Sequence, residues 1–154
     1  MKPKIFLVDL NYINKGKEWT IIPFPLGISY LAAYLEKTIP NKLDITLFKD
    51  PNKFLLTLDT ETPDVVAFSN YIWNQNLQLE FAKLVKKRFP RCITVMGGPN
   101  YNFTEPEWIE NFSRKNSQID FHIDGEGEVP FANLISCAIH HSFKINAVKA
   151  ANPA

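Results

Sequence analysis

Short apolar runs that alternate with helical stripes are the feature that most constrains this fold. Ile5–Leu10 and Val65–Ser69 are nearly continuous apolar runs, a pattern typical of strands buried on both faces of a parallel sheet. Cys92–Met96 is a third such run. Leu43–Phe48 and Ile119–Ile123 alternate in polarity, and for Leu43–Phe48 this indicates a more exposed face at a sheet edge. We therefore expect five strands.

Between these runs, apolar residues recur at the spacing of helices. One stripe begins at Leu26 and stops at Pro40. Residues 49–62 are ambiguous but compatible with a short helix. Further helical segments are expected between residues 77 and 85, 104 and 112, and 130 and 138, the second of them with Thr104 as a capping-box residue.

Strands that alternate with helices predict an α/β domain with a doubly wound, mostly parallel sheet and right-handed crossovers. We find no internal repeat and no second domain in the 154 residues. We assign residues 1–145 to this domain and expect residues 146–154 to be a frayed tail or the start of a linker.

Composition narrows the class of protein. The net charge is +1, so nothing favours nucleic acid or an anionic membrane as a partner, and no run approaches the ~20 apolar residues of a membrane span. Cys92 and Cys137 are expected to be reduced thiols, which is consistent with a cytoplasmic protein. No C-x-x-C or C-x-x-x-C occurs, so we expect no iron–sulfur cluster or structural zinc in this chain.

In a sheet of this kind, ligands bind beyond the carboxyl ends of the strands. The loops there begin after Asp9, at Pro25, after Ser69, at Gly97 and at Asp124, and the last two of them contain four of the six glycines. Glycine is favoured where a backbone bends tightly or approaches a ligand, although each glycine alone could be a turn residue. The candidate cofactor-binding residues are Leu26, Gly27, Ser69, Asn70, Tyr71, Trp73, Asn74, Gly97, Gly98, Pro99, Gly125, Glu126, Gly127 and Glu128.

Aromatic and amide side chains stand together after the third strand. Tyr71 and Trp73 offer flat apolar surfaces beside Asn70 and Asn74, a combination that suits a large, planar, amide-rich ligand. Two structural interpretations stay open: Trp73 could pack back as a lid on the core, and Asn74 could be a helix N-cap.

The acidic loop from Asp124 to Glu128 argues against phosphate. Carboxylates accept hydrogen bonds from amides or hydroxyls and repel phosphate, although acidic residues at a helix start are also stabilised by the helix dipole. The chain lacks a P-loop, a dinucleotide fingerprint and a G-x-S-x-G elbow, and Ser69 stands where a receiver domain has its aspartate. We can name no catalytic residue and no metal ligand, and we expect structural roles for His122, His140 and His141.

Four blocks of this sequence resemble the N-terminal cobalamin-binding domain of the cobalamin-dependent radical SAM proteins. They appear in the family's order and cover residues ~5 to ~140. The blocks are Pro25–Leu35, Pro63–Ser69, Gly97–Pro99 and Asp124–Glu128, with Tyr71–Asn74 in addition.

The resemblance implies a flavodoxin-like (Rossmann-like) fold with strand order 2-1-3-4-5 and cobalamin bound across the strand ends. It implies metal ion binding through the cofactor's cobalt. It also implies a radical SAM barrel, in cis or in trans, that holds the iron–sulfur cluster and S-adenosylmethionine (SAM). We therefore expect this chain to be the cobalamin-binding module of a methyltransferase-like enzyme and not to be catalytic alone.

One family signature is missing. Cobalamin domains of the methionine-synthase and mutase type carry D-x-H-x-x-G after the first strand, and its histidine ligates cobalt. The matching stretch here is Asp9–Asn14, which has neither the histidine nor the glycine. The radical SAM relatives commonly lack this histidine too, so cobalt's lower ligand is left unassigned, with Asn70 and Tyr71 as candidates to approach it.

Two other functions stay open. The domain could have kept the fold and lost the cofactor, serving as an interaction or substrate-positioning domain whose Tyr71 and Trp73 fill the corrin space. It could also be a complete small enzyme with another cofactor, although no nucleophile–base pair or metal cluster supports that hypothesis.

Overall fold

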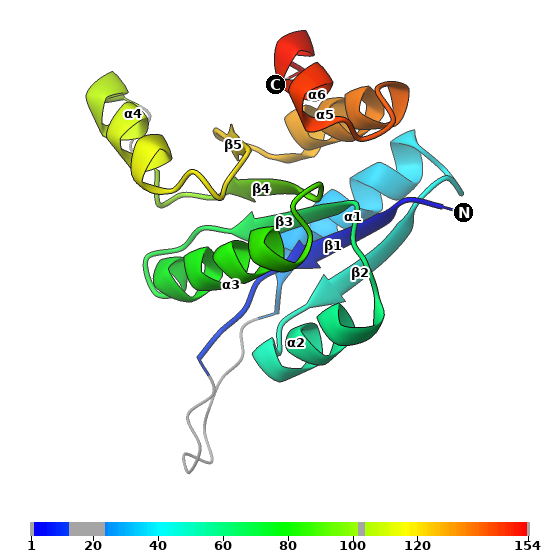
Figure 1. The fold of residues 1–154 in the computed structure, drawn as a ribbon, viewed down its shortest axis with the longest axis horizontal. Coiled ribbons are helices and arrows are strands. Elements are labelled where there is room, and N and C mark those ends of the chain that lie inside the picture. Colours follow the sequence, from blue (N-terminus) through cyan, green and yellow to red (C-terminus); the bar gives the residue numbers. More distant parts are fainter. Residues whose placement is uncertain (1, 13–23, 102–103, 154) are drawn as a thin grey trace.

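The structure, a computed structural model, describes residues 2–12, 24–101 and 104–153. Strands and helices alternate along the chain (Figure 1). The strands are β1 (Lys4–Val8), β2 (Asp44–Phe48), β3 (Val65–Ser69), β4 (Ile93–Gly97) and β5 (Phe121–Ile123). The helices are α1 (Leu26–Thr38), α2 (Pro51–Thr60), α3 (Gln75–Arg88), α4 (Pro106–Lys115), α5 (Glu128–His140) and α6 (Ile145–Ala151).

The five strands form one parallel sheet in the order β2-β1-β3-β4-β5. Ile5 pairs with Ile45 of β2 and with Val65 of β3, and Ser69 pairs with Gly97 of β4. The strand order reverses between β1 and β3, so their carboxyl ends flank the switch point where such sheets bind ligands. The expected flavodoxin-like fold is confirmed, and β2 lies at the sheet edge as its alternating pattern predicts.

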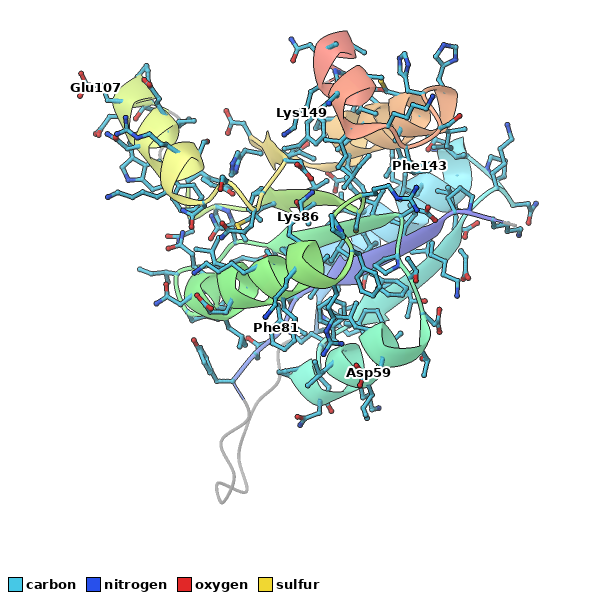
Figure 2. The ribbon with its side chains drawn as sticks, in the orientation of Figure 1. Asp59, Phe81, Lys86, Glu107, Phe143 and Lys149 are labelled. Carbon is cyan, nitrogen blue, oxygen red and sulfur yellow. The ribbon has the colours of Figure 1, made fainter. Side chains whose placement is uncertain are left out.

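Helices cover both faces of the sheet (Figure 1). On one face, α1, α5 and α6 pack against residues such as Ile5 and Val95. On the other, α2 and α3 pack against a face rich in phenylalanine, where Phe81 lies between these two helices with its ring 5.5 Å from that of Phe54 (Figure 2). Neighbouring residues along a strand point to opposite faces of the sheet. A strand with helices on both sides must therefore be apolar at nearly every position, as the near-continuous apolar runs in the sequence are.

Element boundaries differ from the expected ones where polar residues intervene. β1 ends at Val8, so Asp9 and Leu10 lie beyond the strand, and the ambiguous stretch forms α2 with Asp50 as its N-cap. The capping box is wrong: α4 begins at Pro106 with Glu105 as N-cap and without a side-chain cap bond. Proline is favoured in the first turn of a helix, which explains the later start. Pro23 and the loop residues 13–20 lie outside the described residues.

The end of the chain is more ordered than its pattern indicates. Residues 145–151 form α6, and Val148 is fully buried against the core that α5 also lines. Ser142 and Phe143 in the connecting turn both have positive φ, at 52° and 56°. Seven residues are too few for a clear helical stripe, and for this reason the sequence pattern did not predict α6. The boundary at residue 145 stays a prediction.

No helix in the described ranges is long and apolar enough to cross a bilayer.

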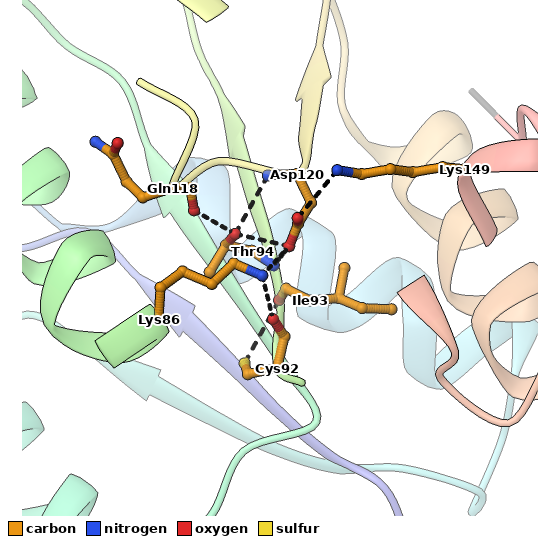
Figure 3. Close-up of polar contacts among 7 residues, drawn as sticks. All are labelled: Lys86, Cys92, Ile93, Thr94, Gln118, Asp120 and Lys149. Carbon is orange, nitrogen blue, oxygen red and sulfur yellow. Dashed lines mark hydrogen bonds and ion pairs between the residues drawn. The ribbon is translucent and has the colours of Figure 1, made fainter. Parts of the chain in front are cut away.

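Asp120 ties α6 and α3 to the sheet (Figure 3). Its carboxylate forms ion pairs with Lys86 of α3 and, at 3.2 Å, with Lys149 of α6, and it accepts a 2.9 Å hydrogen bond from the backbone N–H of Thr94. Burial opposes ionisation of Asp120, but the hydrogen bonds from Lys86 and Thr94 outweigh it and lower its pKa. Asp120 is therefore a nearly buried charge that needs its partners.

We expect Asp120→Ala to lower the free energy of unfolding by about 3 kcal/mol, because it leaves Lys86 with an unpaired, largely buried charge. Amide hydrogen exchange should quicken in residues 145–151, which lose the Lys149 contact. Asp59→Ala is the matched control, since Asp59 pairs with Arg88 at the surface and its loss should cost under about 1 kcal/mol. Equal losses in the two variants, measured by urea unfolding, would contradict the anchoring role of Asp120.

Candidate functional site

A cavity of about 550 Å³ opens at the carboxyl ends of β3, β4 and β5, and we call it the strand-end cavity. Its walls come from the first turns of α1, the loops after β1, β3, β4 and β5, and the start of α5. The volume lies within the range of about 300–1,000 Å³ typical of small-molecule sites. The cavity thus lies where the loops with glycine and aromatic residues were predicted to meet.

The floor of the strand-end cavity is apolar. It comprises Ile28 and Leu31 of α1, Ala67 of β3, Val95 of β4 and Phe131 of α5. Phe131 is 1% exposed, and α1 packs along α5, so the floor is part of the main core. Such a floor suits an apolar, flat chemical group inserted between the two helices and the sheet.

The wall of the cavity carries negative charge. Asp9, Asp124, Glu126 and Glu128 line it, and none of the described residues around it is lysine, arginine or histidine. Carboxylates without a neighbouring cation in the wall favour ligands with N–H or O–H donors and disfavour phosphate. The predicted preference for an amide-rich ligand agrees with this geometry.

Gly98 and Asn70 make the closest backbone approach at the site. Gly98 has a φ of 139°, and a Cβ built on it would lie 2.6 Å from the carbonyl oxygen of Asn70. The Asn70 N–H donates to the Gly97 carbonyl oxygen at 2.7 Å. Only glycine fits such a position, so the β3 and β4 loops are held together along one wall of the cavity.

Asn70 itself is buried and incompletely bonded. Its Oδ1 accepts from Gln75 Nε2 at 3.2 Å and Asn100 Nδ2 at 3.4 Å. Its buried Nδ2 has no acceptor of good hydrogen-bond geometry among the described residues, but the amide acts on the Tyr101 hydroxyl and lowers the pKa of that group against the larger effect of burial. Asn70 therefore supports the wall from behind.

A polar network lies beneath the mouth of the cavity at the switch point. Asp9 is 7% exposed; its Oδ1 accepts from Ser69 Oγ at 2.7 Å and from Asn74 Nδ2 at 3.1 Å, and its Oδ2 pairs with Lys49 Nζ at 3.0 Å. The Nε2 of Gln78 donates to Ser69 Oγ at 3.0 Å. This Asp9 network joins the ends of β1, β2 and β3 to the first turn of α3.

Tyr71 and Trp73 form a stacked pair at the mouth. Their ring centroids are 4.6 Å apart and the planes differ by 8°. Tyr71 lines the cavity, with its hydroxyl 3.5 Å from where a Cβ on Gly27 would lie, whereas Trp73 stacks behind it and is 56% exposed. Burial and, second, the Asp9 carboxylate raise the pKa of Tyr71, so its hydroxyl is a neutral phenol.

The structure brings most of the predicted residues to one cavity. Ten of them line it, namely Gly27, Ser69, Tyr71, Gly97, Gly98, Pro99, Gly125, Glu126, Gly127 and Glu128.

Four predicted residues do not line the cavity. Leu26 and Trp73 point toward solvent, each 56% exposed, and Asn70 and Asn74 are fully buried behind the wall. Trp73 is therefore not a lid on the core. Asn74 stands at the N-cap position of α3, but its side chain makes no cap bond; its Oδ1 accepts from the Tyr71 N–H at 3.0 Å.

The residues that sequence reasoning missed are the supports of the site. Lys49 and Gln78 belong to the Asp9 network but stand in a loop start and a helix, where nothing in the pattern marks them. The role of Asp9 could have been inferred from the sequence, because it is a charged residue that directly follows an apolar strand. A charge at the carboxyl end of a buried strand needs partners, and those partners come from distant segments.

Beside the cavity, α4 covers a smaller aromatic cluster. Tyr101 hydrogen-bonds His122 Nδ1 at 2.8 Å, and Phe112 lies edge-on to both rings. Burial raises the pKa of Tyr101 and lowers the pKa of His122 to about 4. His122 is thus a neutral structural residue, as expected, and no cluster of three metal-ligating side chains occurs among the residues the structure describes.

Comparison with known proteins gives a family match. The family described as "B12 binding domain" matches residues 21–135, which include every predicted cofactor-binding residue. The matched residues also include those that form the apolar floor of the strand-end cavity.

Curated relatives are similar to this chain over a fraction of their own length. The cobalamin-dependent radical SAM methyltransferase TokK of Streptomyces tokunonensis is 34% identical over 139 residues, which cover 86% of this chain and 18% of TokK. The hopanoid C-3 methylase of Methylococcus capsulatus is 33% identical, covering 72% of this chain and 21% of that protein. The chain therefore spans about a fifth of the length of these relatives.

Solved structures support the fold. A signal receiver domain of an HD domain-containing protein from Pseudomonas fluorescens superposes with a TM-score of 0.57 at 14% identity, covering 92% of this chain and 97% of that domain. At this identity the likeness concerns the flavodoxin-like arrangement of strands and helices.

Gly98→Ala should destabilise the protein by distorting the backbone that forms the wall of the site. The added methyl group would meet the Asn70 carbonyl oxygen at 2.6 Å, and the positive φ adds strain, so we expect a loss of about 2–4 kcal/mol of unfolding free energy. Gly125→Ala is the control, because φ is also positive, at 64°, but no atom lies within 4 Å of the added carbon. Its loss should be about 1 kcal/mol. Urea unfolding that ranks Gly125→Ala as the more damaging change would refute this account.

His122 should make stability depend on pH. Its folded pKa of about 4 lies below the ordinary 6.5, so only the unfolded chain takes up the proton as the pH falls from 7 to 5. The contribution is fully present above pH 6.5 and is lost toward pH 4. We expect about 1 kcal/mol less stability at pH 5 than at pH 7, a value reduced for the partial exposure of the ring. His122→Gln should remove that difference, and an unchanged pH slope in the variant would speak against it.

Proposed function

The chain belongs to the B12-binding domain family, and from this premise we propose that its strand-end cavity holds the benzimidazole end of cobalamin's nucleotide tail, with the phosphate of the tail outside the acidic wall, while the surrounding loops carry the corrin. The observation that carries this proposal is the cavity itself, with an apolar floor between α1, α5 and the sheet and an acidic wall in which no described residue is a lysine, arginine or histidine.

The chemistry of the cavity fits the cofactor in two respects. The benzimidazole at the end of the tail is flat and largely apolar, as the floor set by Ile28, Leu31 and Phe131 requires. The corrin is surrounded by amide side chains, whose N–H groups are donors for Glu126 and Glu128 at the mouth. A cavity of about 550 Å³ suits a nucleotide-sized fragment and leaves the corrin at the rim.

The predicted residues divide into three roles in this proposal. Gly97, Gly98 and Gly127 keep the wall free of side chains, so that a ligand can approach the backbone. Glu126 and Glu128 accept hydrogen bonds, and Ser69 forms part of the wall. Leu26 and Trp73 lie outside the cavity and are exposed, and we propose that they support the edge of the corrin.

When bound, cobalamin supplies a cobalt ion that can carry a methyl group, and this is the sense in which the domain binds a metal ion. The chain's own residues leave cobalt's lower face without a histidine from the loop after β1. Of the two candidates to approach that face, Tyr71 borders the cavity as a neutral phenol, whereas Asn70 lies fully buried behind the wall.

The reaction belongs to a larger assembly in this proposal. The chain spans about a fifth of relatives such as TokK, whose name describes a cobalamin-dependent radical SAM methyltransferase. We propose that the domain works in the cytoplasm with a radical SAM barrel, in cis or in trans, which holds the iron–sulfur cluster and SAM. This chain would then deliver the cofactor without catalysing a step alone.

The cofactor-free alternative requires aromatic rings that fill the corrin space. In the structure, Trp73 stacks outside the cavity and Tyr71 forms only part of its wall. The open cavity leaves room for the end of the tail, and the binding test below decides whether the two rings at the mouth support a corrin or replace it.

The test is retention of hydroxocobalamin. The purified chain should bind about one equivalent with micromolar affinity or better, co-elute with it from a sizing column and shift its visible spectrum. Passage of the cofactor through the column unbound at micromolar concentration would contradict the proposal.

A variant that fills the floor should separate cofactor binding from folding. Leu31→Trp places an indole in the cavity from the partly exposed side of α1, and we expect cobalamin affinity to fall at least tenfold, with stability changed by about 1 kcal/mol. Leu56→Trp, on the exposed face of α2, is the control and should bind as the unaltered chain does. Equal affinities in both variants, measured by equilibrium dialysis, would place the ligand elsewhere.

A further inference from the structure

Asp9 is a nearly buried carboxylate that the proposed tail site does not require for its shape. Its side chain is 10% exposed, and its Lys49 partner is 19% exposed. Removing a charged pair from water is costly, and apolar residues of similar size often stabilise a fold equally well. The place of this charge at the switch point, on the wall of the strand-end cavity, therefore calls for a role beyond packing.

A continuous chain of hydrogen bonds leads from Asp9 to Tyr71. Asn74 is fully buried and bridges them: its Nδ2 donates to Asp9 Oδ1 at 3.1 Å, and its Oδ1 accepts from the Tyr71 N–H at 3.0 Å. The backbone of Tyr71 is also fixed from the other side, since its carbonyl oxygen accepts from the N–H groups of Asn74 and Gln75 at 3.1 and 3.0 Å.

Ser69 gives the network its direction. Its hydroxyl donates to Asp9 Oδ1 at 2.7 Å, while its oxygen accepts from Asn74 Nδ2 and from Gln78 Nε2 at 3.1 and 3.0 Å. With Asp9 as the only pure acceptor among these side chains, the direction of each of these hydrogen bonds is defined. An amide at position 9 would lose this order, because it offers a donor to groups that are already donors.

The side chain of Tyr71 completes the link to the site. Its ring stacks on Trp73 at 4.6 Å and borders the cavity opposite Gly27, and the Asp9 charge acts on its hydroxyl. Exposed stacked rings gain little from burial, so their orientation depends on how the loop backbone is held.

We propose that Asp9 is a positioning residue that, through Asn74 and Ser69, holds the Tyr71–Trp73 pair at the mouth of the strand-end cavity as a preformed platform for the ligand. The arrangement of the platform in the ligand-free protein is a property of this chain's own contacts. That the platform receives a corrin rests on the proposed function.

The experiment begins with the cofactor-free chain. The stacked pair contributes to near-ultraviolet circular dichroism, and its share is defined as the signal that disappears in Trp73→Phe. Asp9→Asn should lose at least half of that share while its far-ultraviolet spectrum stays unchanged. Asp44→Asn, the same change at an exposed carboxylate at the amino end of β2, should lose none.

A charge swap distinguishes positioning from general destabilisation. In Asp9→Asn combined with Asn74→Asp, donor and acceptor exchange places, and the new carboxylate can still accept from the Tyr71 N–H. The swap should restore the near-ultraviolet signal to at least four fifths of its original size. Should Asp9→Asn fail to fold, Asn74→Leu cuts the chain of bonds at its centre while leaving Asp9 with Ser69 and Lys49, and it should show the same loss.

Binding of hydroxocobalamin is the second readout. Asp9→Asn should weaken it at least fivefold and the swap should return it to within twofold. An Asp9→Asn or Asn74→Leu single variant that folds and keeps the full near-ultraviolet signal would overturn the positioning role. Failure of the unaltered chain to bind cobalamin would instead overturn the proposed function, and the circular dichroism result would still decide the role of Asp9.

Discussion

β1 pairs with β3 in parallel, and this pairing brings Asp9 to Ser69 across 60 residues of sequence. On one side of the switch point the chain turns toward β2 and Lys49, and on the other toward β4 and its glycines. The buried contacts at this junction hold the β3 loop. The β3 loop, in turn, is locked to the β4 loop because Gly98 lies against the Asn70 backbone. The walls of the cavity therefore depend on how the central strands pair.

The two ends of the sheet are stabilised by different means. At the amino end, a charged cluster around Asp120 joins α3, β4 and α6 through ion pairs with Lys86 and Lys149. At the carboxyl end, the walls contain glycines and carboxylates, and the helices α1 and α5 contribute apolar side chains to the floor. The Asp9 network and the contact of Gly98 with Asn70 also hold this end of the sheet, so each end has its own set of buried contacts.

The sequence predicted what depends on periodicity and spacing. The strands follow from apolar runs, and the meeting of their loops follows from the rule that ligands bind at carboxyl ends, whereas the strand order was implied by the resemblance to the cobalamin-binding family. The pattern did not predict contacts between side chains far apart in the chain, such as those of Lys49 and Gln78 with the Asp9 network. Trp73 was assigned to the site because aromatic residues suit planar ligands, but its ring direction depends on stacking with Tyr71. The short helix α6 gains its order from one buried valine and one ion pair, which no period reveals.

A crystal structure of the chain grown with hydroxocobalamin tests the central claim most directly. The account predicts that the nucleotide tail lies between α1, α5 and the sheet, with its base against Phe131, and that no histidine coordinates the cobalt. The carboxylates Glu126 and Glu128 should lie beside corrin amides, and Tyr71 should keep its contact with Trp73. A cofactor bound elsewhere on the surface, a cavity without the tail, or a histidine on the cobalt would contradict the account.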